Sequence, residues 1–78
     1  MAKTDKEILQ QFGANLKKIR MAKGYSLREL YAASGIDNGK ISRMEQGETN
    51  VTILTIVRLA QALEVDLSEL VSTKALNL

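Results

Sequence analysis

Apolar residues recur every three or four positions in several separate stretches of the chain, which is the spacing that places them on one face of a helix. In the first stretch this stripe consists of Leu9, Phe12, Leu16 and Ile19. The chain contains no Pro, and no stretch alternates between β-branched and polar residues as a half-buried strand does. The pattern therefore predicts an all-α fold.

Capping residues and glycines divide this pattern into separate helices. Residues 4–7 (Thr-Asp-Lys-Glu) and 26–29 (Ser-Leu-Arg-Glu) have the spacing of a capping box, which satisfies free amides at a helix start. Gly24, Gly35 and Gly47 each follow an apolar stretch and can adopt the left-handed conformation that ends a helix. We therefore predict a compact five-helix bundle, with helices near residues 4–23, 26–34, 37–46, 52–63 and 66–73.

The stretch 52–63 differs from the others because its polar residues are few: Thr55, Arg58 and Gln61. We expect this helix to be covered nearly all round and to form the centre of the core. A chain of 78 residues that is 45% apolar can bury one modest core. We expect a single domain over residues 1–78, with its core at about 12–71 and a short C-terminal tail at 72–78.

The composition argues against several classes of function. The chain has neither Cys nor His, so thiolate and imidazole ligands, a disulfide and a histidine base are all missing. Its carboxylates stand at helix caps and exposed positions, and no nucleophile is paired with a base. We expect no catalytic residues, no metal, no cofactor and no small-molecule ligand. The opening Met-Ala-Lys-Thr and the short apolar runs predict a cytoplasmic protein that does not enter a membrane.

Charge is distributed unevenly along the chain. Residues 14–46 contain seven Lys and Arg against three Asp and Glu, whereas residues 47–78 contain two against four. A basic part beside an acidic part favours a polyanionic partner that meets one face of the protein. An ordinary solvated helix surface is the alternative on charge alone.

The join between the second and third predicted helices is the most informative local feature. Gly35, Ile36 and Asp37 leave about three residues for the turn, which suits a steeply crossed helix pair over residues 26–46. Helical spacing puts Ile41, Met44 and Glu45 on one face of the next helix. The opposite face carries Asn38, Gly39, Ser42 and Arg43, whose polar groups and missing side chain suit the reading of base edges. The alternative is that this face is only a solvated polar surface.

These segments resemble the phage-repressor/Cro-type (XRE) helix-turn-helix family. The resemblance rests on residues 24–30 (Gly-Tyr-Ser-Leu-Arg-Glu-Leu), Gly35 and residues 40–47 (Lys-Ile-Ser-Arg-Met-Glu-Gln-Gly). It continues through residues 50–56, 58–65 and 66–70 and covers about residues 12–71. Each piece is weak alone, and their order and spacing together carry the assignment.

The resemblance implies roles for individual residues. Asn38 and Arg43 match the principal base readers, and Gly39 and Ser42 match positions near the groove floor. Residues that match contacts to the DNA backbone are Ser26, Leu27, Arg28, Lys40, Gln46 and Asn50. Arg20 and Glu45 match positions that the family often joins in an ion pair.

The sequence departs from the common family pattern at three positions. Many relatives have Gln at the position of Leu27, Ala at that of Tyr31 and Pro at that of Val51. A leucine side chain cannot bind phosphate, so only the amide of Leu27 is expected to do so. Tyr31 either fills space in the packing, which we favour, or reaches the DNA backbone through its hydroxyl.

We therefore predict a sequence-specific double-stranded DNA-binding protein that regulates transcription, as a repressor, and reads the major groove with helix 37–46. An antitoxin-like or adaptor protein that uses the same fold mainly to hold a protein partner is the alternative. One short recognition helix reads few bases, so we expect a homodimer on a palindromic operator. Candidate contact residues for the dimer are Leu54, Val57, Leu67, Val71, Leu76 and Leu78.

Overall fold

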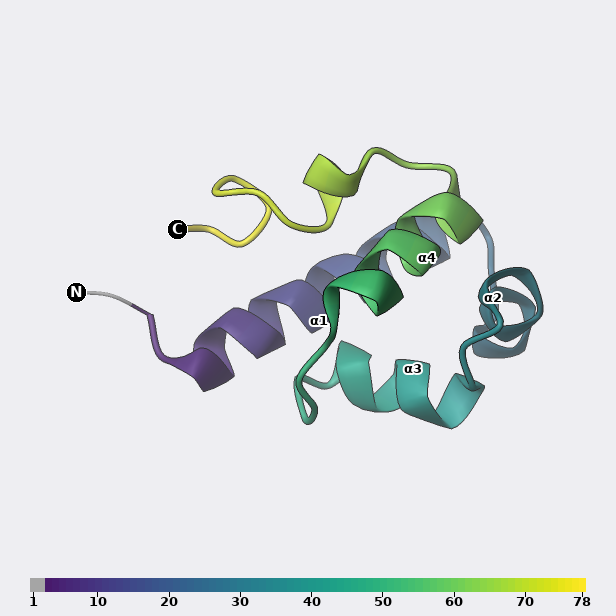
Figure 1. The fold of residues 1–78 in the computed structure, drawn as a ribbon, viewed down its shortest axis with the longest axis horizontal. Helices are drawn as coiled ribbons and strands as arrows, with labels where there is room; N and C mark the ends of the chain where they lie inside the picture. The colour runs from purple at the N-terminus through teal and green to yellow at the C-terminus, as the bar shows by residue number, and fades with distance from the viewer. Residues whose placement is uncertain (1–2) are drawn as a thin grey trace.

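The computed structural model describes residues 3–78, so the first two residues of the expected domain 1–78 lie outside the described part. Within it the chain forms α-helices and one short 3₁₀ helix, with no strand (Figure 1). The all-α prediction is confirmed. In chain order the elements are α1 (Asp5–Ala22), α2 (Leu27–Ser34), α3 (Asn38–Glu45), α4 (Ile53–Leu63) and η1 (Leu67–Glu69).

The two capping boxes expected from the sequence are formed. Thr4 precedes α1 and Ser26 precedes α2, and each hydroxyl accepts a hydrogen bond from the amide of the Glu three residues later. Each Glu side chain in turn accepts from the backbone amide of its capping residue, and this bond lowers the pKa of Glu7 and of Glu29. Both helices therefore begin where the sequence predicts.

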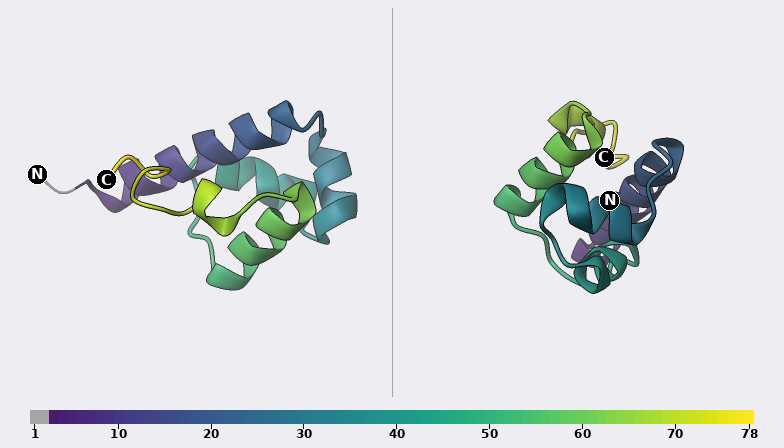
Figure 2. Two further views of the ribbon diagram at one scale, coloured as in Figure 1. Left: turned by 90° about the horizontal axis from the view of Figure 1, so that it is seen from above. Right: turned by 90° about the vertical axis from the view of Figure 1, so that its right-hand side faces the viewer.

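The buried core draws on every helix. α1 and α4 flank it, α2 closes one end and α3 lies beneath (Figure 1 and Figure 2). Asn15 on α1 also donates a side-chain hydrogen bond to the carbonyl oxygen of Glu69, which ties the C-terminal segment to this helix. The buried apolar residues are Phe12, Leu16, Leu30, Ile36, Ile41, Met44, Leu59, Ala60, Leu63 and Leu70.

The prediction of a fifth α-helix at residues 66–73 is wrong. Only Leu67–Glu69 is helical there, as a single 3₁₀ turn. Leu70 is fully buried, and Val71 and Leu76 also pack against the core. Leu76 lies beyond residue 73, and a straight helix could not bring it to the same side as Leu70, so the chain turns between them. The hydroxyl of Ser72 accepts from the amide of Ala75, which is the kind of local bond that competes with a helix.

The expectation that α4 is covered nearly all round is also wrong. Its buried residues Leu59, Ala60 and Leu63 form one stripe that faces α2 and η1. No described element packs over its first turn, where Ile53 is 62% exposed and Leu54 is 68% exposed. α4 is a surface helix with one buried face, and its outer face carries Ile53 and Leu54 on the first turn and the exposed Arg58 and Gln61 further along.

No helix in the described part of the chain is both long enough and apolar enough to span a membrane.

Candidate nucleic-acid interface

α2, a three-residue turn and α3 form the helix-turn-helix unit. Gly35 ends α2 in the left-handed conformation, with φ of 75°, and its amide donates to the carbonyl of Tyr31 at 2.8 Å. Ile36 anchors the turn because its side chain is buried in the core. Asp37 then starts α3, since its carboxylate accepts from the amides of Gly39 and Lys40 at 2.9 and 3.2 Å. Figure 1 shows α2 nearly end-on and α3 side-on, so the two cross steeply.

α3 has one buried side and one accessible side. Ile41 and Met44 are almost completely buried and fix the helix to the core. Lys40 and Arg43 are exposed. The other three positions singled out as base readers are half-buried at the protein surface: Asn38, Gly39 and Ser42.

The polar groups on the accessible side differ in how far they are already engaged. Ser42 accepts a hydrogen bond from the side-chain amide of Gln46 at 3.2 Å, so a base-reading candidate and a backbone candidate are joined in the free protein. The side chains of Asn38 and Arg43 have no hydrogen-bond partner among residues 3–78. Arg43 lies close to Gly39, where an added Cβ would sit 4.0 Å from its Nη1 atom and 3.0 Å from Asp37 Oδ2.

The start of α2 offers donors for a phosphate. Ser26 Oγ is occupied as an acceptor by the amide of Glu29, at 3.0 Å, and its hydroxyl proton stays available. The amides of Leu27 and Arg28 make no hydrogen bond within the described residues, as is usual in a first helical turn. The leucine side chain itself packs partly against the core.

The loop between α3 and α4 offers a second set of donors. Asn50 accepts from the amide of Val51 with its Oδ1 atom at 3.0 Å, which leaves the side-chain NH₂ free to donate. Thr52 caps α4, with its hydroxyl accepting from the amide of Thr55 at 3.3 Å. The exposed start of α4 thus stands beside Asn50, at the end of the loop that begins with Gln46.

α3 is held against α1 by a buried ion pair. Arg20 Nε and Glu45 Oε2 lie 2.7 Å apart, and a second bond joins Arg20 Nη2 to Glu45 Oε1 at 3.1 Å. Their side chains are only 10% and 6% exposed. Arg20 also donates to the carbonyl of Tyr25 at 2.7 Å. The hydrogen bonds with Glu45 raise the pKa of Arg20, although burial of the guanidinium acts against this.

A close backbone contact reinforces the same junction. Gly13 of α1 packs on the end of α3, where a Cβ atom would lie 2.5 Å from the carbonyl oxygen of Glu45 and still closer to that of Met44. Sequence reasoning missed Gly13. A glycine in the middle of an otherwise regular helix, next to the buried Phe12, was the available signal, because Gly is unfavourable in a helix interior unless packing requires it.

Tyr31 projects from α2 and is 46% exposed. Its hydroxyl has no hydrogen-bond partner in the described part of the chain. The favoured interpretation, that it fills space in the packing, therefore applies only to part of the ring.

The dimer candidates fall into two groups. Val71 and Leu76 pack against the protein's own core, as Leu67 does in part. Leu54 and Leu78 are among the most exposed apolar residues, and Val57 is half-buried. Ile53, which sequence reasoning did not single out, is exposed beside Leu54 on the first turn of α4.

The side chains that could bind a metal do not form a metal site in the described part of the chain. Among residues 3–78 no group of three or more His, Cys, Asp or Glu side chains is placed to hold an ion.

Comparisons with known sequences agree with this geometry. The sequence profile of the helix-turn-helix family HTH_3 matches residues 16–70. The uncharacterized HTH-type transcriptional regulator y4dJ of Sinorhizobium fredii (strain NBRC 101917 / NGR234) is 40% identical over 60 residues, which are 77% of this chain and 78% of that protein. The HTH-type transcriptional regulator SutR of Escherichia coli (strain K12) is 32% identical over 57 residues, and the matched part is 32% of its length.

Solved structures with the same arrangement are also found. The restriction-modification controller protein C.AhdI from Aeromonas hydrophila superimposes with a TM-score of 0.79 at 38% identity, covering 81% of this chain and 96% of that one. The clp gene regulator ClgR from C. glutamicum gives a TM-score of 0.81 at 27% identity, covering 90% and 88% of the two chains. The junction of α2 and α3 therefore lies within a fold shared with known regulators.

Proposed function

This chain belongs to the HTH_3 helix-turn-helix family, of the phage-repressor and Cro (XRE) type, and from that premise we propose how it regulates transcription. It binds double-stranded DNA by sequence and places α3 in the major groove. One observation carries the proposal: α3 buries Ile41 and Met44 while a set of unpaired polar groups remains on its other side. Those groups are free to bind base edges without loss of any contact that holds the fold.

Two residues carry the base reading. The guanidinium of Arg43 suits the O6 and N7 acceptors of guanine, and the amide of Asn38 suits the N6 and N7 atoms of adenine. Gly39 has no side chain to hold the helix away from the bases. Ser42 reads its base by exchanging the hydrogen bond from Gln46 for one to DNA, and Gln46 then turns to the backbone.

Backbone contacts set the orientation of α3 in the groove. The free amides at the start of α2, with the hydroxyl of Ser26, bind one phosphate. Asn50 and Gln46 bind phosphate on the other side of α3. Lys40 and Arg28 add positive charge along the backbone, because both are exposed. These contacts supply affinity that does not depend on sequence.

Substitution separates the two kinds of contact. Arg43→Ala should cost about 1–3 kcal/mol of discrimination at one base pair, because a bidentate contact to guanine is lost. Lys40→Ala should weaken binding to all sequences about equally and reduce the slope of log affinity against log salt by about one unit. Both variants are measured by titration on the best duplex selected from a random pool and on random DNA. Equal losses on the two duplexes for both variants would contradict the assignment.

A homodimer would contact twice as many base pairs as one subunit. We propose that the exposed apolar start of α4, with Leu54 and Val57, faces its copy across a two-fold axis. Ile53 extends the same patch, because it is exposed beside Leu54 on the first turn of α4. An apolar surface on an otherwise charged protein supports this assignment. The two copies of α3 would then lie about 34 Å apart, one turn of DNA, and the operator would be palindromic.

Leu54→Glu should convert the dimer into a monomer. Each subunit would lose the burial of one leucine, about 1.5–3 kcal/mol, so the dissociation constant of the dimer should rise more than about a hundredfold. Sedimentation equilibrium measures this directly, and Ala14→Glu on the exposed side of α1 is the control for added charge. A variant that dimerises as the parent does would place the interface elsewhere.

Repression is the regulatory outcome that we propose, because a dimer bound across a palindrome occupies DNA that a polymerase would need at an overlapping promoter. Transcription in vitro from a template carrying the selected site tests this. A fall in transcript with added protein supports repression, and a rise would assign activation instead.

A further inference from the structure

The N-terminal half of α1 lies against the loop that we propose as a backbone contact. Lys6 and Gln10 line a surface cleft together with Gln46 and Asn50. Gln10 touches Gly47 so closely that a Cβ atom there would lie 2.7–2.9 Å from it. The loop is therefore seated directly on this part of α1.

The helical register explains this placement. Lys6, Gln10 and Gly13 are spaced by four and three positions, so they follow one line along α1. Gly13 contacts the end of α3 and Gln10 contacts the following loop. Lys6 is one turn nearer the N-terminus on the same line, within the first turns of α1. This N-terminal part of α1 extends beyond the other helices (Figure 2).

The charge of Lys6 is not neutralised within the protein. Its side chain is exposed, and the sole ion pair formed within residues 3–78 joins Arg20 and Glu45. The adjacent Glu7 is engaged in the capping box of α1 through the amide of Thr4. Glu48 lines the same cleft but lies more than 4.0 Å from the Lys6 ammonium.

We propose that Lys6 binds a DNA phosphate next to the one bound by Gln46 and Asn50. α1 would then extend the DNA interface by one backbone contact beyond the helix-turn-helix unit. A lysine suits this role because its flexible stem and compact charge can follow a phosphate without a fixed hydrogen-bond geometry. The proposal rests on the function proposed above, since it adds a contact to the same duplex.

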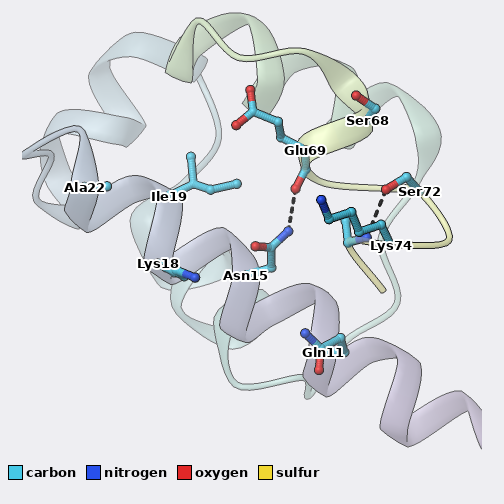
Figure 3. Close-up of a pocket in the computed structure, with 10 residues that line it drawn as sticks. Gln11, Asn15, Lys18, Ile19, Ala22, Ser68, Glu69, Ser72 and Lys74 are labelled. Carbon is cyan, nitrogen blue, oxygen red and sulfur yellow. Dashed lines mark hydrogen bonds between the residues drawn. The ribbon is translucent and has the colours of Figure 1, made fainter. Parts of the chain in front are cut away.

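The test compares two lysines of α1. Lys6→Ala should lower the slope of log affinity against log salt by about 0.9, so a fourfold rise in salt would weaken the variant about 3.5-fold less than the parent. Lys18 is the matched control because it is exposed on the same helix but lies in a different groove, which α1 forms with the C-terminal segment. Glu69 and Ser72 line that groove together with Lys18 (Figure 3). Lys18→Ala should leave the slope unchanged, and Lys6→Arg should restore it.

The parent and all three variants are titrated on the selected duplex and on random DNA of equal length, and thermal unfolding by circular dichroism verifies that they fold. Equal slopes for the parent and Lys6→Ala would overturn this contact while leaving the proposed function intact. A parent protein that binds neither duplex would instead overturn the proposed function.

Glu48 provides a second discriminating arm. If Lys6 merely offsets the charge of Glu48, the effect of Lys6→Ala should vanish in a Glu48→Gln background, and the phosphate contact would be wrong. If Lys6 binds phosphate itself, the same loss of slope should persist in that background.

Discussion

Glu45→Ala is expected to destabilise the folded protein by about 3–5 kcal/mol, because it leaves the guanidinium of Arg20 buried without its counter-charge. Both side chains are nearly inaccessible, so water cannot replace the lost carboxylate. The carbonyl of Tyr25 would remain as the single acceptor. Urea unfolding monitored by circular dichroism measures the change in free energy.

The control for this experiment removes both charges. Arg20→Met combined with Glu45→Leu should recover most of the loss, since apolar groups of similar size often replace a buried ion pair without cost. A loss below about 1 kcal/mol for Glu45→Ala alone would mean that the pair is solvated and does little to hold α3.

Gly13→Ala should destabilise the protein by about 1–3 kcal/mol or more, although Gly to Ala inside a helix normally stabilises by about 1 kcal/mol. The added methyl group would meet backbone carbonyls of Met44 and Glu45, which move only if α3 moves. We also expect weaker DNA binding, because α3 is displaced at its C-terminal end. Thermal unfolding and DNA titration of the variant measure the two effects.

Gly39→Ala is the matched control for the stability measurement, because Gly39 is the other glycine within a helix. It is not a control for DNA binding, since Gly39 is itself proposed to lie against the bases. A methyl group there meets the side-chain oxygen of Asp37 at 3.0 Å, not backbone, and that side chain can shift slightly. Because that oxygen also caps α3 through the amides of Gly39 and Lys40, any loss of stability should be much smaller than in Gly13→Ala. If the two variants changed stability equally, the contact between Gly13 and α3 would not be limiting.

The helix starts were predictable from the sequence because caps are local. Thr4 and Ser26 bond to amides only three residues away, and Asp37 to amides two and three away. The turn at Gly35 depends on the conformation of one residue. The buried and accessible sides of α3 could also be predicted, because helical spacing within eight residues decides which side chains share a face.

The predictions were wrong where contacts between residues far apart in the sequence decide the local structure or the burial of a side chain. An apolar α4 looks buried in sequence, but whether Ile53 and Leu54 are covered depends on which elements reach them, and none of the described elements does. The 66–73 segment has a helix cap, yet Leu70 and Leu76 both pack inward and the chain must turn between them. Gly13 escaped notice because its partner lies more than thirty positions away in the sequence.

The candidate site was predictable in its residue types and only partly in its internal contacts. Spacing indicated that Ser42 and Arg43 face outward, and the structure leaves both accessible. The hydrogen bond between Ser42 and Gln46 was not foreseen, although positions four apart on a helix are neighbours. The exposure of Tyr31 could not be predicted in this way, because it depends on which other parts of the fold reach its ring, and the local sequence does not specify that.

The division of α3 into an anchored side and an accessible side has an evolutionary consequence. Ile41 and Met44 hold the helix in the core and take no part in the accessible surface. The side chains of Asn38 and Arg43, which make no hydrogen bond in the described part of the chain, can therefore be exchanged without loss of a contact that holds the fold, and Ser42 at the cost of its bond with Gln46. With the base reading proposed above, duplicated copies of such a gene could acquire new operators through a few substitutions at these positions, and a designer could retarget the protein in the same way. Selection for folding and selection for the DNA site would act on different residues of one eight-residue helix.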